Sequence, residues 1–316
     1  MRRSKVLINR YPASFSELRS GRCSWEKTAL NCWTPSLIPA STHLTAPAAT
    51  AERNTSLEAG SKTETTEKVI VLTKCGNVGL FGRVRVNRKV IMRELEKSLN
   101  ELQTDYVDIY LLHRDDPSTP VGEIMETLNE AKRCGKIRIF GVSNWTHQRI
   151  EEANRYAKEH GLEGFSVSSP NYSLARQLKD PYGGSCVTIS GPENEDARNW
   201  YSKTGMPVLA YSSLGHGFFN GRFQSGDYEA AKKVLDRPAQ KGFLYQENMK
   251  RLHNAEVLAK RDGCSVAEVA MRYVFSSPMN LFAIASTTKP SRLSGIISAT
   301  HAPFPPEDVT YLENEQ

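Results

Sequence analysis

Six short apolar runs, separated by stretches with helical periodicity, constrain the fold of this chain more than any other feature. The runs are "VIVLT" (69–73), "VDIYLL" (107–112), "IRIFGV" (137–142), "GFSVSS" (164–169), "PVLAYS" (207–212) and "LFAIAS" (281–286). They lack the clean alternation of apolar and polar residues that half-exposed strands show, as expected of parallel strands covered on both faces. The pattern therefore predicts an α/β fold with a parallel sheet.

The stretches between the runs have the spacing of amphipathic helices. Residues 88–102 place four apolar side chains on one stripe, and residues 123–135 do the same before Gly135, a residue type that commonly follows a helix end. Ser265 and Glu268 have the spacing of a capping box at the start of a further helix. The early runs are about 30 to 40 residues apart, which fits either a (β/α) barrel or a doubly wound sheet.

Polar residues gather at the carboxyl ends of the runs, and this feature favours a barrel. No G-x-G-x-x-G follows the first run, where a doubly wound fold would bind a pyrophosphate. In barrels, the edge formed by the carboxyl ends of the strands builds the active site. Taken singly, each polar residue has an ordinary explanation as a loop charge, a cap or a turn, but recurrence at six ends indicates a functional edge. We predict a (β/α)₈ TIM-barrel type of fold that is incomplete, with about six βα units present.

Residues 1–67 differ in composition from the rest of the chain. They are rich in Ser, Thr, Ala and Pro without a sustained period, so they cannot bury enough apolar surface to offset the entropy of ordering. The first 50 residues hold seven lysines and arginines and two acids, a net charge of +5 out of +6. We expect a disordered or targeting-like segment at 1–67 and a barrel domain at 68–316. This segment fits an organellar transit peptide, a disordered tail without a targeting function, or a misassembled start of the coding sequence.

The charge and the cysteines narrow the function classes. Residues 51–316 carry a net charge of only +1, which argues against nucleic-acid binding, and no apolar run is long enough to span a bilayer. The six cysteines are scattered without metal-like spacing, which indicates reduced thiols and no metal site. We expect a cytoplasmic protein that acts on a small molecule, with a chloroplast or mitochondrial location as the alternative. The sequence does not indicate an oligomeric state.

The motifs from residue 68 to about residue 300 resemble those of the aldo-keto reductase family, the (β/α)₈ barrels that reduce carbonyls with NADPH. The matching pieces follow in family order and at family spacing: "VIVLTK", "LEKSLNELQTDYVDIYLLHRDD", "GKIRIFGVSN", "NYSLA", "VLAYSSLGHGFF" and "IASTTKPSRL". The resemblance implies an NADP-dependent oxidoreductase that reduces aldehydes or ketones to alcohols by hydride transfer. The implied partner is a small-molecule carbonyl substrate.

The resemblance assigns two catalytic roles. Lys74 would lower the pKa of a catalytic tyrosine, and His113 would orient the substrate carbonyl and assist proton transfer. A tyrosine, with an ordinary pKa near 10, needs such a neighbouring cation to act as a general acid. The family's tyrosine lies in a D-T-A-x-x-Y-G segment with the aspartate that pairs with the lysine. This chain has no such segment, and Tyr11 is the only tyrosine ahead of Lys74.

Two further expectations follow from that difference. The first concerns function: the alternative to a reductase is a catalytically impaired relative, a barrel fragment that binds a nucleotide or a partner. The second concerns the sheet. The family's first two strands are not evident in residues 1–67, which would leave the runs at 69–73 and 281–286 as open edges.

The resemblance also implies a set of cofactor-binding residues. Ser143 and Asn144 would hydrogen-bond the nicotinamide carboxamide, Tyr211 would stack on the nicotinamide ring, and Ser169 replaces a family glutamine that contacts the carboxamide. The other residues in the set are Ser212, Leu214, Ser286, Thr287 and Arg292. A guanidinium suits the adenosine 2′-phosphate, which favours NADP over NAD. Pro290 stands where a helix can begin and aim free N–H groups at the phosphate region.

The substrate is not indicated by the sequence. The family sets it largely by loops at the barrel mouth, and one such loop, residues 180–201, forms an expected insertion between a strand and a helix. Trp145 and Phe218 fit either the wall of a substrate pocket or ordinary packing.

Overall fold

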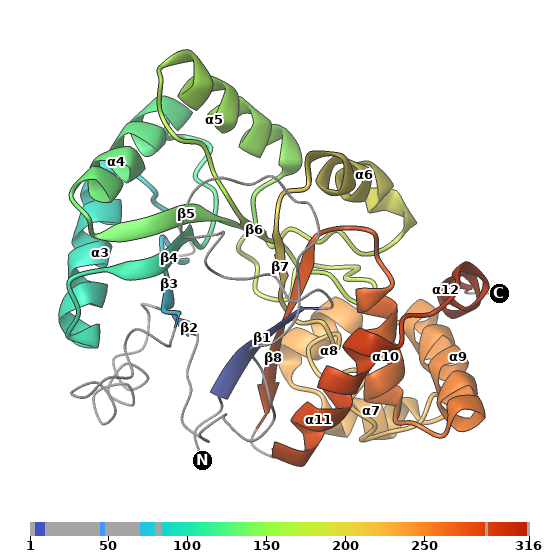
Figure 1. Ribbon diagram of the computed structural model, residues 1–316. Helices are drawn as coiled ribbons and strands as arrows, with labels where there is room; N and C mark the ends of the chain where they lie inside the picture. Colours follow the sequence, from blue (N-terminus) through green and yellow to red (C-terminus); the bar gives the residue numbers. More distant parts are fainter. Residues whose placement is uncertain (1–3, 10–44, 48–69, 80–83, 288–289, 315–316) are drawn as a thin grey trace. The chain divides into compact units, whose positions relative to one another are not determined.

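The computed structural model describes residues 4–9, 45–47, 70–79, 84–287 and 290–314. From residue 72 onward six strands alternate along the chain with helices, as the sequence predicts (Figure 1). The chain folds as two compact units, one chiefly of residues 12–168 and the other chiefly of residues 169–316. Each unit is an α/β unit with parallel strands.

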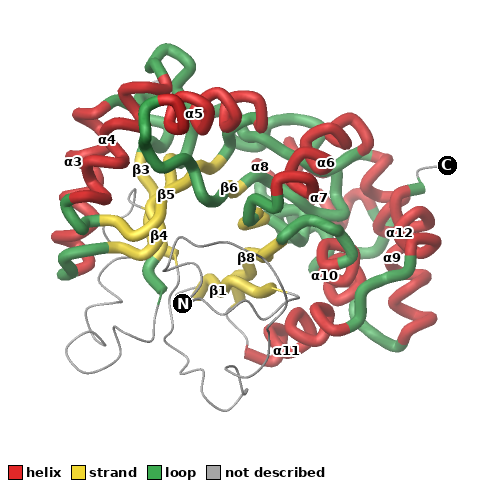
Figure 2. Tube along the Cα trace, turned by 45° about the horizontal axis from the view of Figure 1, so that its top comes forward, coloured by secondary structure: helices red, strands yellow, loops and turns green. Residues whose placement is uncertain are grey.

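The unit of residues 12–168 contains a four-stranded parallel sheet. In sheet order, its strands are β2 (Thr45–Pro47), β3 (Leu72–Cys75), β4 (Val107–Leu112) and β5 (Ile137–Ser143). Three helices cover one face of β3 to β5, as both views show (Figures 1 and 2): α3 (Arg88–Leu102), α4 (Val121–Arg133) and α5 (His147–Glu159). All strands of this unit are paired in parallel, so their carboxyl ends meet at one edge.

Local sequence signals fix the ends of these helices. The side chain of Asn87 accepts a hydrogen bond from Val90 N at the start of α3, and Thr146 caps α5 in the same way. Gly135 follows the end of α4 with φ at 75°, a left-handed conformation that glycine adopts without a Cβ penalty. The predicted α3 stripe is buried, with Ile91 and Leu95 fully inaccessible.

The unit of residues 169–316 combines a short parallel pair of strands with seven helices in its described part. The strands are β7 (Val208–Ala210) and β8 (Leu281–Thr287), in register from Val208 opposite Leu281. Its helices are α6 (Glu195–Thr204), α7 (Tyr228–Val234), α8 (Arg237–Phe243), α9 (Gln246–Asp262), α10 (Val266–Phe275), α11 (Pro290–Ser298) and α12 (Pro306–Glu313). The predicted capping box of Ser265 and Glu268 begins α10.

Three predicted boundaries differ from the structure. The fourth run forms only the two-residue strand β6 (Ser168–Ser169), which lies at the boundary of the two units. The first run begins as a strand at Leu72, so Lys74 lies within β3 and not at its end. The second half of the expected insertion at 180–201 is helical, because α6 begins at Glu195.

The segment expected to be disordered contains two strands. One is β1 (Ser4–Asn9), and the other is β2, which pairs in parallel with β3. The expectation of open edges beside the runs at 69–73 and 281–286 is therefore wrong, because β2 pairs with β3 and β1 lies next to β8 in the sheet order. Most of residues 1–67 lie outside the described residues, so the expectation for that segment as a whole stays a prediction. Of the helices described, none combines the length and the apolar character needed to cross a membrane.

Candidate active site

Lys74 and His113 occupy the same face of the sheet in the unit of residues 12–168. Thr73 Oγ1 lies 3.5 Å from Ser98 Oγ of α3, and Tyr110 Oη donates to Ile91 O of α3 over 3.1 Å. Thr73 and Tyr110, which are cross-strand partners, therefore face α3. Because side chains alternate along a strand, Lys74 and its partner Leu111 point to the opposite face, and His113 continues that alternation. Both side chains are partly exposed.

The backbone of β4 continues to pair as far as His113. His113 N donates to Cys75 O over 2.6 Å, so the histidine is held beside the end of β3 although β4 ends at Leu112. On its other side Asn144 Nδ2 donates to His113 O over 3.0 Å and to Ser143 Oγ over 3.1 Å. The ends of three neighbouring strands are therefore joined, and Lys74, His113, Ser143 and Asn144 lie at one edge of this sheet.

Asn144 takes a backbone conformation that few residues adopt. Its φ is 59°, in the left-handed region, and its side chain is buried. Asparagine tolerates this region better than most residues with a Cβ. The turn directs the Asn144 amide back towards the end of β4, where it makes the two hydrogen bonds that fix Ser143 and the His113 carbonyl.

The loop that follows His113 is held by Asp116. Its carboxylate accepts hydrogen bonds from Ser118 Oγ over 2.5 Å, Thr119 Oγ1 over 3.1 Å and Val86 N over 3.2 Å. Although burial favours the neutral form, these donors lower the pKa of Asp116. Of the two acids that follow His113 and Arg114 in the sequence, Asp116 therefore has a structural role: it holds the loop that begins at His113.

Cys75 is not suited to act as a nucleophile in this site. It is buried on the face of β3 that packs against α3, and burial raises the pKa of its thiol to about 12. A thiolate is the reactive form of cysteine, so a thiol with this pKa stays protonated at neutral pH. The described cysteines, which are Cys75, Cys134, Cys186 and Cys264, are all free.

In the unit of residues 169–316, Ser169 and Tyr211 lie on neighbouring segments. Ser169 Oγ donates to Leu209 O over 2.8 Å, and Asn171 Nδ2 donates to Tyr211 O over 3.1 Å. Ser169 is fully buried, whereas Tyr211 is partly exposed immediately after β7. In this structure the hydroxyl of Ser169 therefore links two neighbouring strands, and its expected contact with a carboxamide stays a prediction.

The loop between β7 and α7 contains five residues in the left-handed region. They are Ser212, Gly215, His216, Gly217 and Gly221, with φ between 53° and 91°. Gly215 N, Gly217 N and Phe218 N donate to carbonyls of the same loop, at Ser212, Leu214 and Gly215, so the loop is built from tight turns. Left-handed conformations strain a non-glycine residue and often mark functional loops. Ser212 and Leu214, both predicted cofactor contacts, belong to this loop.

The other predicted residues lie at the end of β8 and the start of α11. Ser286 and Thr287 are the last two residues of β8, and α11 begins at Pro290 as predicted. Arg292 lies in the first turn of α11. The side chains of these three predicted contacts lie outside the described part, so their roles stay predictions.

Trp145 and Phe218 are core residues. Trp145 is buried and meets Phe165 edge to face, with ring centroids 5.3 Å apart. Phe218 is buried within unit 169–316 and packs edge to face on Phe219 and Phe223. The sequence fitted either a substrate-pocket wall or core packing for these two residues, and the structure supports core packing.

Sequence reasoning missed a turn in the loop at 180–186. The Asp180 carboxylate accepts hydrogen bonds from the backbone N–H groups of Tyr182, Gly183 and Cys186, at 2.9, 3.0 and 3.1 Å. Although burial favours the neutral form, these donors lower the pKa of Asp180 to about 2. The sequence "DPYGG" contains the signal, because an aspartate ahead of Pro and Gly favours such a turn.

Replacing Asp180 with Ala is expected to lower the free energy of unfolding by about 1 kcal/mol at pH 7, a value discounted for solvent screening. A lowered pKa in the folded state stabilises the protein above the ordinary pKa of 3.8, and this contribution is lost as the pH falls towards 2. Urea denaturation between pH 7 and pH 2.5 measures the effect. Asp105→Ala, at an exposed position, is the control. A constant difference between wild type and Asp180→Ala across this range contradicts the assignment.

Comparisons with known proteins identify the family of this chain. A family model described as the aldo/keto reductase family matches residues 50–315. The aldo-keto reductase YhdN of Bacillus subtilis is 29% identical over 78% of this chain and 71% of its own length. Norsolorinic acid reductase B of Aspergillus parasiticus is 25% identical over 73% of this chain. A probable voltage-gated potassium channel subunit beta of Oryza sativa subsp. japonica is 26% identical over 66% of this chain. The chain spans only 58% and 60% of the latter two relatives.

A solved structure shares the fold. The crystal structure of a thermostable aldo-keto reductase, Tm1743, in complex with the inhibitor epalrestat, matches with a TM-score of 0.62. The match covers 88% of this chain and 83% of that chain at 21% sequence identity. The likeness confirms the predicted α/β fold of TIM-barrel type.

Proposed function

Because the chain belongs to the aldo/keto reductase family, we propose that it reduces an aldehyde or ketone to an alcohol with NADPH. The observation that carries this proposal is that Lys74 and His113 lie on one face of a parallel sheet, near the carboxyl ends of neighbouring strands: Lys74 is the last residue but one of β3, and His113 directly follows β4. That edge carries the active site in barrel enzymes. Beside a reacting carbonyl oxygen, a cation can stabilise the developing negative charge and an imidazole can donate a hydrogen bond.

The side chains have distinct tasks in this reaction. When bound, the nicotinamide cofactor supplies the hydride. The carbonyl oxygen gathers negative charge as the carbonyl carbon accepts that hydride, and His113 donates a hydrogen bond that holds the oxygen in place. The ammonium of Lys74 adds positive charge on the same face and stabilises the developing alkoxide. The alkoxide must then gain a proton from a general acid.

The described residues have the chemistry to hold the cofactor. Ser143 and Asn144 supply a hydroxyl and an amide, which together offer the donors and acceptors that a carboxamide requires. In the unit of residues 169–316, Tyr211 follows β7 with a partly exposed ring, which suits stacking on a flat nicotinamide ring. Arg292 and the N-terminus of α11 both favour a negative charge.

Arg292 is expected to make the chain prefer NADPH to NADH. A charge-assisted hydrogen bond to the 2′-phosphate contributes about 1.5–3 kcal/mol, which is about ten- to a hundredfold in affinity. Titration of nicotinamide fluorescence with each cofactor measures the ratio. Arg292→Ala is expected to erase the preference, and Arg292→Lys to retain part of it, because the ammonium keeps the charge but lacks the planar fork. Arg155→Ala, at an exposed position on α5, is the matched control. Equal affinities of the wild type for the two cofactors contradict the assignment.

A second function is favoured by one observation of the sequence. Tyr11 is the only tyrosine ahead of Lys74, so the 316-residue chain lacks the segment that carries the family's general acid. A chain of this kind would bind the cofactor without reducing a carbonyl at a useful rate. Saturable NADPH binding without NADPH oxidation supports this second function, whereas turnover supports the first.

A further inference from the structure

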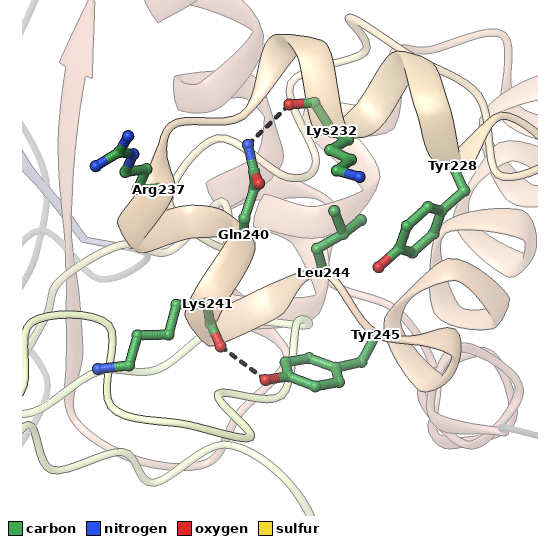
Figure 3. Close-up of a pocket in the computed structure, with 7 residues that line it drawn as sticks. All are labelled: Tyr228, Lys232, Arg237, Gln240, Lys241, Leu244 and Tyr245. Carbon is green, nitrogen blue, oxygen red and sulfur yellow. Dashed lines mark hydrogen bonds between the residues drawn. The ribbon is translucent and has the colours of Figure 1, made fainter.

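The side chains that line an open, shallow depression between α7, α8 and the start of α9 do not form a shared binding site (Figure 3). Arg237 and Lys241 point away from Lys232. The hydrogen bonds drawn there join the helices themselves, because Gln240 Nε2 donates to Lys232 O over 2.8 Å and Tyr245 Oη donates to Lys241 O over 2.9 Å. The depression is therefore an ordinary part of the surface.

Arg149, in the first turn of α5, is a cation of a different kind, because its guanidinium is held from several sides. Its Nη2 donates to Thr119 O over 2.8 Å, and its Nη1 donates to Glu152 Oε2 over 2.9 Å. Its Nε lies 3.6 Å from Asp115 Oδ2. Only 16% of the Arg149 side chain is exposed. Ordering a long side chain costs entropy, so a single surface ion pair would not explain this arrangement.

One side of Arg149 holds the loop that begins at His113. Thr119, which accepts the hydrogen bond from Arg149, is tied in turn to Asp116: Thr119 Oγ1 donates to Asp116 Oδ2 over 3.1 Å, and Thr119 N donates to Asp116 O over 2.9 Å. Asp116 is the residue that holds this loop, so the guanidinium reaches the His113 loop at its far end.

The other side of Arg149 meets the turn that carries Asn144. Trp145 directly follows Asn144 and is 1% exposed, and the guanidinium carbon of Arg149 lies 5.5 Å from the centroid of its ring. A cation at this distance is attracted by the face of an indole. Asn144 Nδ2 donates to His113 O over 3.0 Å. The two loops are therefore joined twice, by Asn144 at the edge of the sheet and by Arg149 farther along the chain.

Asp115 gives the charge of Arg149 a second task, because this carboxylate has little access to water. Only 16% of the Asp115 side chain is exposed, and its Oδ1 is buried without a hydrogen-bond partner among the described residues. Burial raises the pKa of Asp115, and the charge of Asp116 acts in the same direction, whereas the charge of Arg149 lowers that pKa. Removal of Arg149 would leave an ionised carboxylate uncompensated in a poorly hydrated place, which costs more than loss of an exposed pair.

We propose that Arg149 is a positioning residue of the candidate active site, which keeps His113 and Asn144 in register by tying the loop after β4 to the turn after β5. Arg149 acts through these two residues and does not itself touch the reacting groups. Its part in catalysis rests on the proposed function, but the coupling of the two loops is tested without turnover. A misplacement of about 1 Å can cost about a hundredfold in rate, so loss of this coupling would matter to the reaction.

The first test compares Arg149→Met with Arg149→Lys in the full chain. The readout is the Cε1–H NMR resonance of His113 in protein labelled with ¹³C-histidine, assigned with His113→Gln. We expect Arg149→Met to shift or broaden this resonance, because the loop that begins at His113 is no longer tied to α5. Arg149→Lys should restore part of the wild-type signal, since an ammonium keeps the charge but cannot bond Thr119 and Asp115 with a planar fork.

The pH dependence of stability tests the charge pairing with Asp115. In Arg149→Met the ionised Asp115 has lost its cation, and protonation at lower pH removes that uncompensated charge. The urea midpoint of Arg149→Met should therefore fall below that of the wild type by more at pH 8 than at pH 5. Arg149→Met/Asp115→Asn should recover part of the loss at pH 8. An equal difference at both pH values counts against the proposal.

Lys132→Met is the matched control, because Lys132 pairs with Glu163 in the same unit and this pair involves neither loop. It should leave the His113 resonance as in the wild type. Where the chain turns over an aldehyde, Arg149→Met should lower kcat about tenfold with little change in the KM of the aldehyde. A wild type that neither binds nor oxidises NADPH contradicts the proposed function, whereas the His113 resonance still reports on Arg149. Should Arg149→Met not fold, Arg149→Met/Asp115→Asn takes its place. An unchanged His113 resonance in the folded variant overturns the proposal, and so does an equal change in Lys132→Met.

Discussion

The purified 316-residue chain is expected to oxidise NADPH with a panel of aldehydes at a rate far below the ordinary enzyme range of about 1–10³ s⁻¹. Positioned proton transfer typically contributes about 10² to 10⁴-fold to a rate. The family obtains it from a tyrosine beside the lysine, and Tyr11 is the only tyrosine ahead of Lys74 in this chain. In the proposed reaction His113 would orient the oxygen, but Lys74 has no tyrosine in that segment to activate.

The assay distinguishes a missing acid from a missing fold. NADPH binding is measured on the same preparation. A chain that binds the cofactor but turns over slowly is folded and lacks the general acid. The slow rate should increase as the pH falls, because hydronium ions then replace the absent general acid. Turnover within the ordinary range would show that another group of this chain supplies the proton.

Replacing Gly141 with Ala is expected to lower the free energy of unfolding by about 3 kcal/mol or more. A Cβ at position 141 of β5 would stand 2.0 Å from Val167 O and 2.6 Å from Val167 Cγ1. The backbone there cannot move freely, because Val142 N donates to Val167 O and Ser166 N donates to Phe140 O. Urea denaturation followed by circular dichroism measures the loss.

A glycine in open space provides the control for Gly141. A Cβ at Gly226 would meet no heavy atom within 4 Å, and its φ is not positive. Gly226→Ala should therefore change the free energy of unfolding by less than about 0.5 kcal/mol. Similar stabilities of the two variants would show that the segment at Val167 can move away from β5 without loss.

The helices of this chain were predictable because their signals are local. The stripe of residues 88–102 matches α3 from Arg88 to Leu102, and the capping box at Ser265 matches the start of α10. In both cases the hydrogen bonds that cap the start of the helix join residues three apart in the sequence. The face of each helix that packs against the core follows from its 3.6-residue period.

The strands were less predictable because strand pairing depends on residues that are distant in the sequence. The run at 164–169 has the composition of a strand, but only Ser168 and Ser169 form β6. Conversely, Thr45 to Pro47 pair with β3 although they have no strand pattern and include a proline. Proline is tolerated at a sheet edge, where one N–H is not needed for pairing. An edge strand of three residues thus depends on its neighbour and not on its own sequence.

The candidate site was predictable in its residue types and only partly in its geometry. The ends of the runs indicated Lys74, His113, Ser143 and Asn144, and the structure brings these four to one edge. The bond from Ser169 Oγ to Leu209 O joins residues 40 apart. The hydrophobic periodicity of a sequence cannot predict a contact between residues so far apart.

Position 144 shows how two independent requirements restrict the amino acids that a site accepts. The backbone there needs a residue that tolerates φ of 59°, which favours Gly, Asn and Asp. The bonds to His113 O and Ser143 Oγ need a side-chain N–H donor, which Gly lacks and an ionised Asp cannot supply. Glutamine has the donor but adopts this region less readily than asparagine. Asparagine meets both demands with a short side chain, so few substitutions at this position would keep the turn and its two hydrogen bonds together.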